Sequence, residues 1–265
     1  MSTSPSIRPP AVAGLFYPGN ATELRALLRR LLAENPTQAP PPKALIAPHA
    51  GYLYSGPIDA RAYNALRGLR ESIRRVVLLG PAHRVALSGL ALPTVGYFRS
   101  PLGDVPLDRE ACALLEGLPQ VGYSDHAHQL EHSLEVHLPF LQTLLYQFLL
   151  VPLVVGWAQP DAVARVLELL WGGKETLVII SSDLSHYQPS DLARKLDETT
   201  AQHIENLHVP IDEHHACGAH PINGLLTSVR GHRLRVQRLD LRNSSDTAGT
   251  PERVVGYGAW AFYDA

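Results

Sequence analysis

Three short hydrophobic runs, each followed within a few residues by a histidine, most constrain how this chain can fold. Each run is rich in branched aliphatic residues and is closed by glycine, proline or serine, which predicts a buried strand. The runs and their histidines are 44–47 with His49, 76–79 with His83, and 177–180 with His186. If the strands are parallel and adjacent, the three histidines lie at one edge of a sheet. In open α/β sheets, ligands bind at the carboxyl ends of the strands.

Helical and strand patterns alternate through most of the chain. Residues 43–79 read as a strand, a helix and a strand, so we expect two parallel strands joined by a crossover. The predicted helices are one capped by Asn20, then 55–69, 108–118, 134–146, 160–171, 189–207 and 217–229. Further strands are predicted at 149–155, 176–180, 233–243 and 253–263, the last two as an antiparallel pair. We therefore predict the α/β class, with a mixed sheet covered by helices on both faces.

The chain is expected to form one domain over residues 1–265, with residues 1–19 as an extended, proline-rich arm. Its 265 residues are 45% hydrophobic and 18% charged, which is enough to bury a full core. A net charge of −2 without long runs of one sign argues against a nucleic-acid partner. The N-terminus lacks the apolar core of a signal peptide, and the apolar stretch 148–157 is too short to cross a bilayer. With two cysteines only, a reducing, cytoplasmic location is the simpler expectation.

His49 and Cys217 are the first two candidates for residues of a functional site. His49 follows a strand and precedes Ala50 and Gly51, so it is either a ligand or base with room for a small molecule, or a histidine that satisfies loop backbone groups. Cys217 lies at the start of a predicted helix, whose dipole would lower the pKa of the thiol and favour thiolate. The alternative for Cys217 is a small buried apolar residue, a role that fits Cys112 better.

A set of two histidines and a cysteine would suit iron, copper or zinc. A cysteine–histidine nucleophile pair is the competing use of the same residue types. Asp183 and His186 lie three residues apart after a strand, and they are either an acid–base pair facing one cavity or, for Asp183, a turn cap. The sequence leaves these alternatives open.

The stretch 126–137 holds four histidines and two glutamates, but it lacks the HExxH spacing of a zinc-binding helix. His132 and His137 are five residues apart, so they do not share one helix face. We interpret Glu131, His132 and Glu135 as residues that orient the metal ligands without binding the metal themselves.

Five motifs in order resemble the Memo family, whose prokaryotic members are also called AmmeMemoRadiSam system protein B. The motifs are APHAGYLYSG, LLGPAH, EHSLEVHLPFL, SSDLSHY and a late CG, and with GLFYPG in the arm they cover nearly the whole chain. The resemblance implies a fold like that of the class III extradiol dioxygenases, which use non-haem Fe(II). It also implies metal ligands at His49, His83 and Cys217, with Asp183 and His186 lining the pocket.

Two functions follow from this resemblance. The first is a redox enzyme that binds Fe(II) or copper, with zinc as a further choice, and in which His186 and Asp183 move a proton for an unknown small substrate. A thiolate in place of the dioxygenase carboxylate softens the site. The second is a binding or adaptor module with an enzyme-like pocket, because eukaryotic members are associated with phosphotyrosine peptides. The prokaryotic name also implies a radical S-adenosylmethionine protein as a partner.

Overall fold

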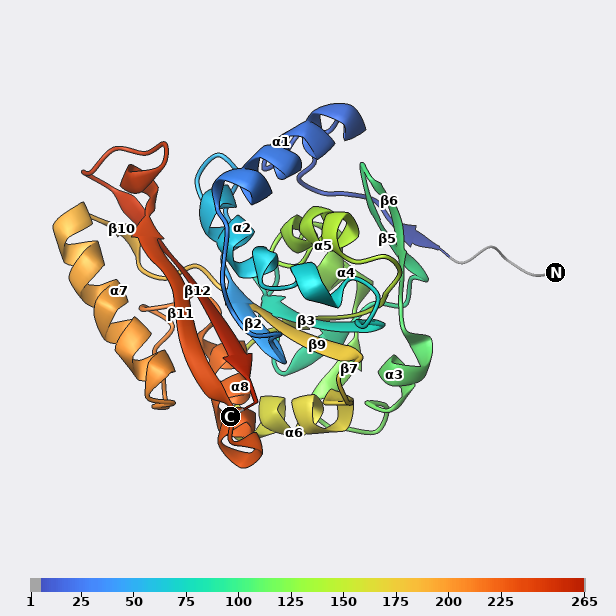
Figure 1. Ribbon diagram of the computed structural model, residues 1–265. Helices are drawn as coiled ribbons and strands as arrows, with labels where there is room; N and C mark the ends of the chain where they lie inside the picture. The colour runs from blue at the N-terminus through green and yellow to red at the C-terminus, as the bar shows by residue number, and fades with distance from the viewer. Residues whose placement is uncertain (1–5, 265) are drawn as a thin grey trace.

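The computed structural model describes residues 6–264, so residues 1–5 of the predicted arm and the final alanine lie outside the described chain. A twisted central sheet runs through the molecule with helices packed on both of its faces (Figure 1). The predicted fold class, a single-domain α/β protein with a mixed sheet, is confirmed.

The central sheet has nine strands in the order β10-β12-β2-β9-β3-β8-β4-β7, and β11 pairs with β12 beside this path. Strands β2, β9, β3 and β8 are parallel neighbours, whereas β12 is antiparallel to β2 and β4 is antiparallel to β8. The strands are β2 (Ala44–Ala47), β3 (Arg75–Pro81), β4 (Leu90–Leu92), β7 (Val121–Tyr123), β8 (Leu149–Val155), β9 (Thr176–Ser181), β10 (His186–Gln188), β11 (Arg235–Asn243) and β12 (Val254–Tyr263).

The three strands predicted from the hydrophobic runs lie side by side and run in the same direction. β9 lies between β2 and β3, with Ala47 paired to Ser181 and Leu79 paired to Ile180. The carboxyl ends of all three strands therefore meet at one edge of the sheet, although the middle strand comes last in the chain. The predicted antiparallel pairing of the two late strands, β11 and β12, is also confirmed.

Two hydrophobic cores cover the two faces of the sheet. Successive residues of a strand point to opposite faces, so Leu45 of β2 belongs to one core and Ile46 to the other. This explains why the runs are apolar at every position rather than at alternate ones. One face packs α1 (Ala21–Glu34), α2 (Gly56–Asn64), α4 (Asp125–Gln129) and α5 (Leu138–Leu144). The other packs α3 (Arg109–Ala113), α6 (Pro160–Leu170), α7 (Ser190–Glu205) and α8 (Ala219–His232).

A smaller sheet holds Ile7 and Arg8 of the N-terminal arm. β1 (Ile7–Arg8) pairs with β5 (Tyr97–Ser100), which pairs in turn with β6 (Gly103–Pro106). The arm then leads to α1, where the side chain of Asn20 accepts hydrogen bonds from the backbone N–H groups of Thr22 and Glu23. This is the predicted helix cap, and it fixes where the arm ends.

Three predicted helices are shorter than their patterns indicated, and the first of them, predicted at 55–69, ends as α2 at Asn64. The helix predicted at 134–146 begins as a 3-10 turn, η2 (Glu135–His137), and continues as α5. Pro139 has no N–H to donate to the carbonyl of Glu135, which disfavours a regular α-helical turn there. The helix predicted at 108–118 is reduced to α3, and the chain between α3 and η2 contains β7 and α4. Two further 3-10 turns are η1 (Arg67–Leu69) and η3 (Ser244–Asp246).

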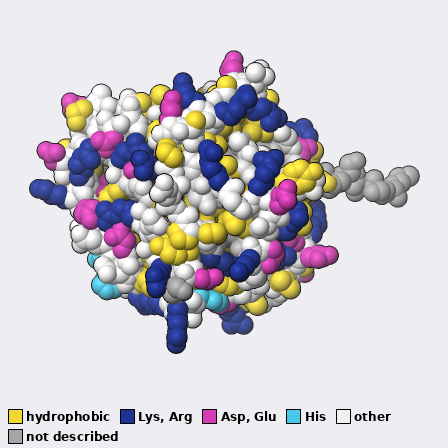
Figure 2. Space-filling view, viewed as in Figure 1, with side chains coloured by type: hydrophobic (Ala, Val, Ile, Leu, Met, Phe, Trp, Pro, Cys, Tyr) yellow, Lys and Arg dark blue, Asp and Glu magenta, His cyan; other side chains and the backbone are white. Residues whose placement is uncertain are grey.

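On the face shown in Figure 2, basic and acidic side chains are interspersed with apolar ones, in keeping with a net charge of −2. Among residues 6–264, no helix combines the length and the apolar character that crossing a membrane requires.

Candidate metal site

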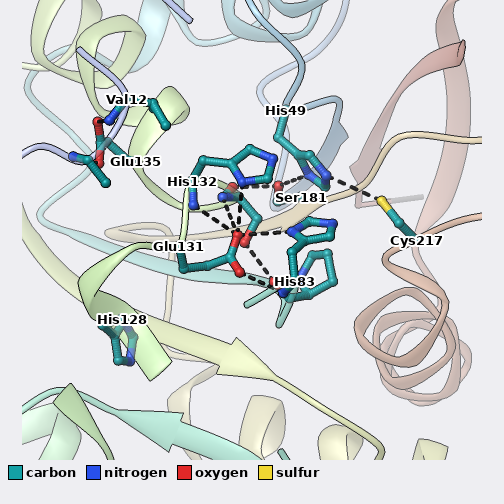
Figure 3. Close-up of polar contacts among 12 residues, drawn as sticks. Val12, His49, His83, His128, Glu131, His132, Glu135, Ser181 and Cys217 are labelled. Atoms are coloured by element: carbon teal, nitrogen blue, oxygen red, sulfur yellow. Dashed lines mark hydrogen bonds and ion pairs between the residues drawn. The ribbon is translucent and has the colours of Figure 1, made fainter. Parts of the chain in front are cut away.

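The histidines predicted after β2 and β3 meet in space. His49 follows β2 and His83 follows β3, and their ring centroids are 5.1 Å apart. A third histidine, His132, reaches the same point from the loop between α4 and η2 (Figure 3). One ring nitrogen from each of the three lies within 4.8 Å of one from each of the others. This spacing is compatible with one shared metal ion after small side-chain adjustments.

The ring of His49 is fixed in one tautomer. Its Nδ1 lies 2.6 Å from Oγ of Ser181, and that hydroxyl donates its own proton to the carbonyl of Ser133 at 2.6 Å. Because the hydroxyl proton is already committed, Nδ1 must donate to Ser181, which leaves Nε2 unprotonated. Burial, together with the neighbouring histidines, lowers the pKa of His49 well below its ordinary value. The ring is therefore neutral, as metal binding requires.

His83 is oriented by Glu131. The carboxylate of Glu131 accepts from the backbone N–H of His83 at 2.6 Å and lies 2.9 Å from Nδ1 of its ring. It also accepts from the backbone N–H groups of His132 and Ser133. Burial alone raises the pKa of Glu131, but the hydrogen bonds and charge of His83 outweigh it and lower the pKa to about 2. A carboxylate that stays ionised holds the Nδ1 proton of His83 and leaves Nε2 free to bind metal.

His132 completes the group of three. Its ring stacks on that of His83 at 4.7 Å between centroids, and Phe16 of the arm packs against it at 4.9 Å. Burial lowers the pKa of His132 to about 4, so the ring is neutral. Its buried Nδ1 lies 3.3 Å from Oε1 of Glu131 but forms no hydrogen bond among the described residues. A neutral, partly unpartnered imidazole beside two others is a suitable nitrogen donor.

His132 was predicted to support the ligands and not to bind the metal, because histidines five residues apart do not share one helix face. The loop between α4 and η2 is not helical, so that spacing rule does not apply there. The signal that could have identified His132 is its position beside Glu131 in a loop between two helical segments. The expectation that Glu131 supports a histidine agrees with its contacts to His83.

Cys217 lies two residues before α8 and contacts His49 rather than the whole group. Its Sγ is 3.3 Å from Nε2 of His49 and accepts from the backbone N–H of Asp183 at 3.3 Å. Burial and the charge of Asp183 raise the pKa of this thiol, so the predicted lowering by the helix dipole is wrong. The helix begins only at Ala219, and desolvation of the thiolate dominates. A bound metal ion would have to displace the thiol proton.

The two residues expected to move a proton have different surroundings. Asp183 is buried after β9, and its Oδ1 accepts from the backbone N–H of His49 at 2.8 Å. Burial raises the pKa of Asp183 to about 6, although the hydrogen bond from His49 and the charge of His186 lower it. His186 is partly exposed in β10, which pairs with β12. Asp183 therefore holds the backbone of the loop that contains His49. The charge of His186 also acts on its carboxyl group.

The buried His128 makes the folded protein sensitive to acid. It is 2% exposed, and its Nε2 donates to the carbonyl of Ala91 at 2.8 Å. Burial lowers its pKa from 6.5 to about 4 despite that bond. The unfolded chain thus binds more protons between these values, so this contribution to stability is complete above pH 6.5 and is lost as the pH falls towards 4. His137, whose pKa burial lowers to about 3, acts in the same direction.

We expect the free energy of unfolding to fall by about 2 kcal/mol through His128 alone between pH 7.5 and pH 5. Urea unfolding at the two pH values measures it. The variant His128→Gln keeps an N–H donor but does not titrate. Between the two pH values its free energy of unfolding should therefore fall by about 2 kcal/mol less than that of wild type. An unchanged decline in this variant would contradict the assignment.

The architecture and the site define an α/β protein with a histidine cluster at the carboxyl edge of its parallel strands. The chain belongs to the Memo family, because the family model described as "Memo-like protein" matches residues 8–261. A "MEMO1 family protein" of Sulfolobus acidocaldarius is 34% identical over 97% of this chain and 100% of its own length. One from Aquifex aeolicus is 35% identical over 95% of this chain and 97% of its own length.

The fold is similar to that of a solved structure. It is the crystal structure of an uncharacterized protein from Escherichia coli K12, with a TM-score of 0.51 and 13% sequence identity. The match covers 82% of this chain and 98% of that chain. At this identity the likeness concerns the fold alone.

Proposed function

We propose that this protein binds a redox-active metal ion, iron or copper, and uses it on a small substrate. The observation that carries the proposal is the group of three imidazoles whose nitrogens lie within 4.8 Å of one another. Two of them, His49 and His83, have their Nδ1 protons committed to Ser181 and Glu131, so their Nε2 atoms are available as ligands. Metal–imidazole bonds of about 2.0–2.1 Å place neighbouring ligand nitrogens roughly 3–4 Å apart.

His49, His83 and Cys217 are the proposed ligands, and His132 is a further nitrogen donor at the same place. Imidazole suits iron, copper and zinc alike, whereas a thiolate favours softer ions such as Cu(I) and zinc. A redox role requires iron or copper, since zinc has a single oxidation state in proteins. When bound, the metal supplies one-electron chemistry to a substrate or to O2. The protein's own contribution is to hold the ligands, exclude water and, through His186 and Asp183, move a proton.

Cobalt spectroscopy distinguishes the third ligand. In protein purified without oxygen and loaded with Co(II), Cys217→Ser should remove the intense sulfur-to-metal charge-transfer band. His132→Ala should keep that band and bind cobalt more weakly. A wild-type spectrum without the band would exclude Cys217 as a ligand and leave the three histidines. Wild-type protein that takes up neither cobalt, iron nor copper on titration would overturn the proposal.

The alternative is a binding module for a peptide or a partner such as a radical S-adenosylmethionine protein. One observation favours it. A groove of about 830 Å³ lies between the arm, α1 and the loop after β2, and the apolar side chains of Leu15 and Leu53 in its lining are 81% and 69% exposed. Leu53→Asp should abolish the cellular role under this alternative and leave metal content unchanged. His49→Ala should abolish the role only under the redox proposal.

A further inference from the structure

The side chain of Arg8, in the N-terminal arm, is buried against the loop that carries His132. It is 4% exposed, which is rare for an arginine, and its guanidinium is satisfied by acceptors on that loop. Its Nε donates to the carbonyl of His128 at 2.7 Å, and its Nη2 donates to the carbonyl of Glu131 at 2.5 Å. Its Nη1 forms an ion pair with Glu135 at 2.7 Å. One guanidinium thus binds three residues of the segment 128–135, namely His128, Glu131 and Glu135.

Glu135 binds the arm in return. Its carboxylate accepts from the backbone N–H groups of Ala11 and Val12 at 2.7 and 3.0 Å, and from the hydroxyl of Tyr17 at 2.5 Å. Every donor in this set, including Arg8, belongs to the arm. Figure 3 shows Glu135 beside Val12 at the side of the site next to His132. The buried pair Arg8–Glu135 is therefore the junction between the arm and the loop.

The junction contacts the residues that hold two candidate ligands, His83 and His132. The carbonyl that Arg8 binds belongs to Glu131, whose carboxylate orients the ring of His83. The next residue, His132, is covered by Phe16 of the same arm, and the carbonyl of Phe16 accepts from the backbone N–H of Tyr52. A shift of the arm would move Glu131 and His132 together, because both are held by contacts that start from it.

We propose that Arg8 is a positioning residue of the metal site, acting through the backbone of Glu131 and through Glu135 on His83 and His132. The inference rests on the proposed function and adds that the N-terminal arm is part of the site. Residues that orient metal ligands typically change metal affinity by about 10–100-fold when they are replaced. A purely structural arginine would change stability and leave the affinity of the folded site unaltered.

The test uses the full-length chain and Co(II) as the probe. Removing one partner would leave a buried charge unpaired, so the main variant is the double change Arg8→Met with Glu135→Gln, which removes both charges. We expect the affinity for cobalt to fall by about tenfold or more. The cobalt spectrum should change, and hydrogen exchange at the amides of Ala11 and Val12 should become faster. Arg8→Lys should recover part of the affinity, because an ammonium can still pair with Glu135.

The matched control is the double change Arg75→Met with Asp108→Asn, which likewise removes both charges of an ion pair. Arg75 pairs with the buried Asp108 at 2.7 Å, at the start of β3 and hence at the opposite edge of the sheet. This control should lower stability but keep wild-type cobalt affinity. The inference is overturned if the Arg8–Glu135 double variant binds cobalt within twofold of wild type, or if the Arg75–Asp108 control weakens binding equally. Failure of the proposed function is seen separately and first, as wild-type protein that binds no cobalt, and it overturns this inference as well.

Discussion

His49→Ala protein, purified without oxygen, is expected to contain no stoichiometric metal, whereas wild-type protein binds about one ion per chain. The ring of His49 lies 5.1 and 5.4 Å from those of His83 and His132 between centroids, and its Nε2 lies 3.3 Å from Sγ of Cys217, so the change removes a donor that is next to every other candidate ligand. We expect the affinity for Fe(II) or Co(II) to fall by more than the roughly 10–100-fold typical of residues behind a ligand. Elemental analysis and anaerobic titration measure this loss.

Two comparisons keep this result specific. His203→Ala removes an exposed histidine of α7, and it should retain full metal content. Urea unfolding of His49→Ala checks that the fold persists, since the ring is buried and its loss leaves a cavity. A folded His49→Ala protein with wild-type metal content would remove His49 from the ligand set.

Glu131→Gln should weaken metal binding by about 10–100-fold although no proposed ligand is changed. The carboxylate accepts from three backbone N–H groups and lies against Nδ1 of His83. A glutamine offers one acceptor oxygen and turns an NH2 group towards N–H donors, so buried donors lose their partners. That loss should also reduce the free energy of unfolding by about 1–3 kcal/mol.

The control for this variant is Glu198→Gln on α7. Glu198 pairs with Arg238 on the other side of the molecule, where the carboxylate is 45% exposed. Its replacement should leave metal affinity unchanged and cost little stability. Isothermal titration with Co(II) compares the variants. Equal affinities of Glu131→Gln and wild type would show that the tautomer of His83 does not depend on this carboxylate.

The strands were predictable because their residues are apolar at every position. β2, β3, β8 and β9 were identified from continuous aliphatic runs, and β8 was predicted with its observed bounds. The order of strands was not, because sequence gives no sign that β9 inserts between β2 and β3. Short elements at the sheet edge, such as β7 and α4, have too few residues for a periodic pattern to develop.

The site was predicted in part for a physical reason. His49 and His83 were visible as residues that directly follow strands, and the edge of a parallel sheet brings such residues together. His132 lies in a loop whose path is set by Arg8 and Glu131, through contacts more than 100 residues apart for Arg8. The raised pKa of Cys217 depends on desolvation in the folded protein, which no local pattern encodes.

The hydrogen bond from Ser181 to the carbonyl of Ser133 has a consequence for how this protein can diverge. Residues 131–133 support two candidate ligands. The carbonyl of Ser133 accepts from Ser181, which holds His49, and the carboxylate of Glu131 holds His83. Gly80, at the end of β3, admits this tripeptide, because a Cβ there would lie 2.7 Å from Oγ of Ser133. An insertion or deletion in the tripeptide would misalign two imidazoles from separate strands at once. Relatives are therefore expected to keep or lose this loop as one unit, and chimaeras should exchange it together with residue 80.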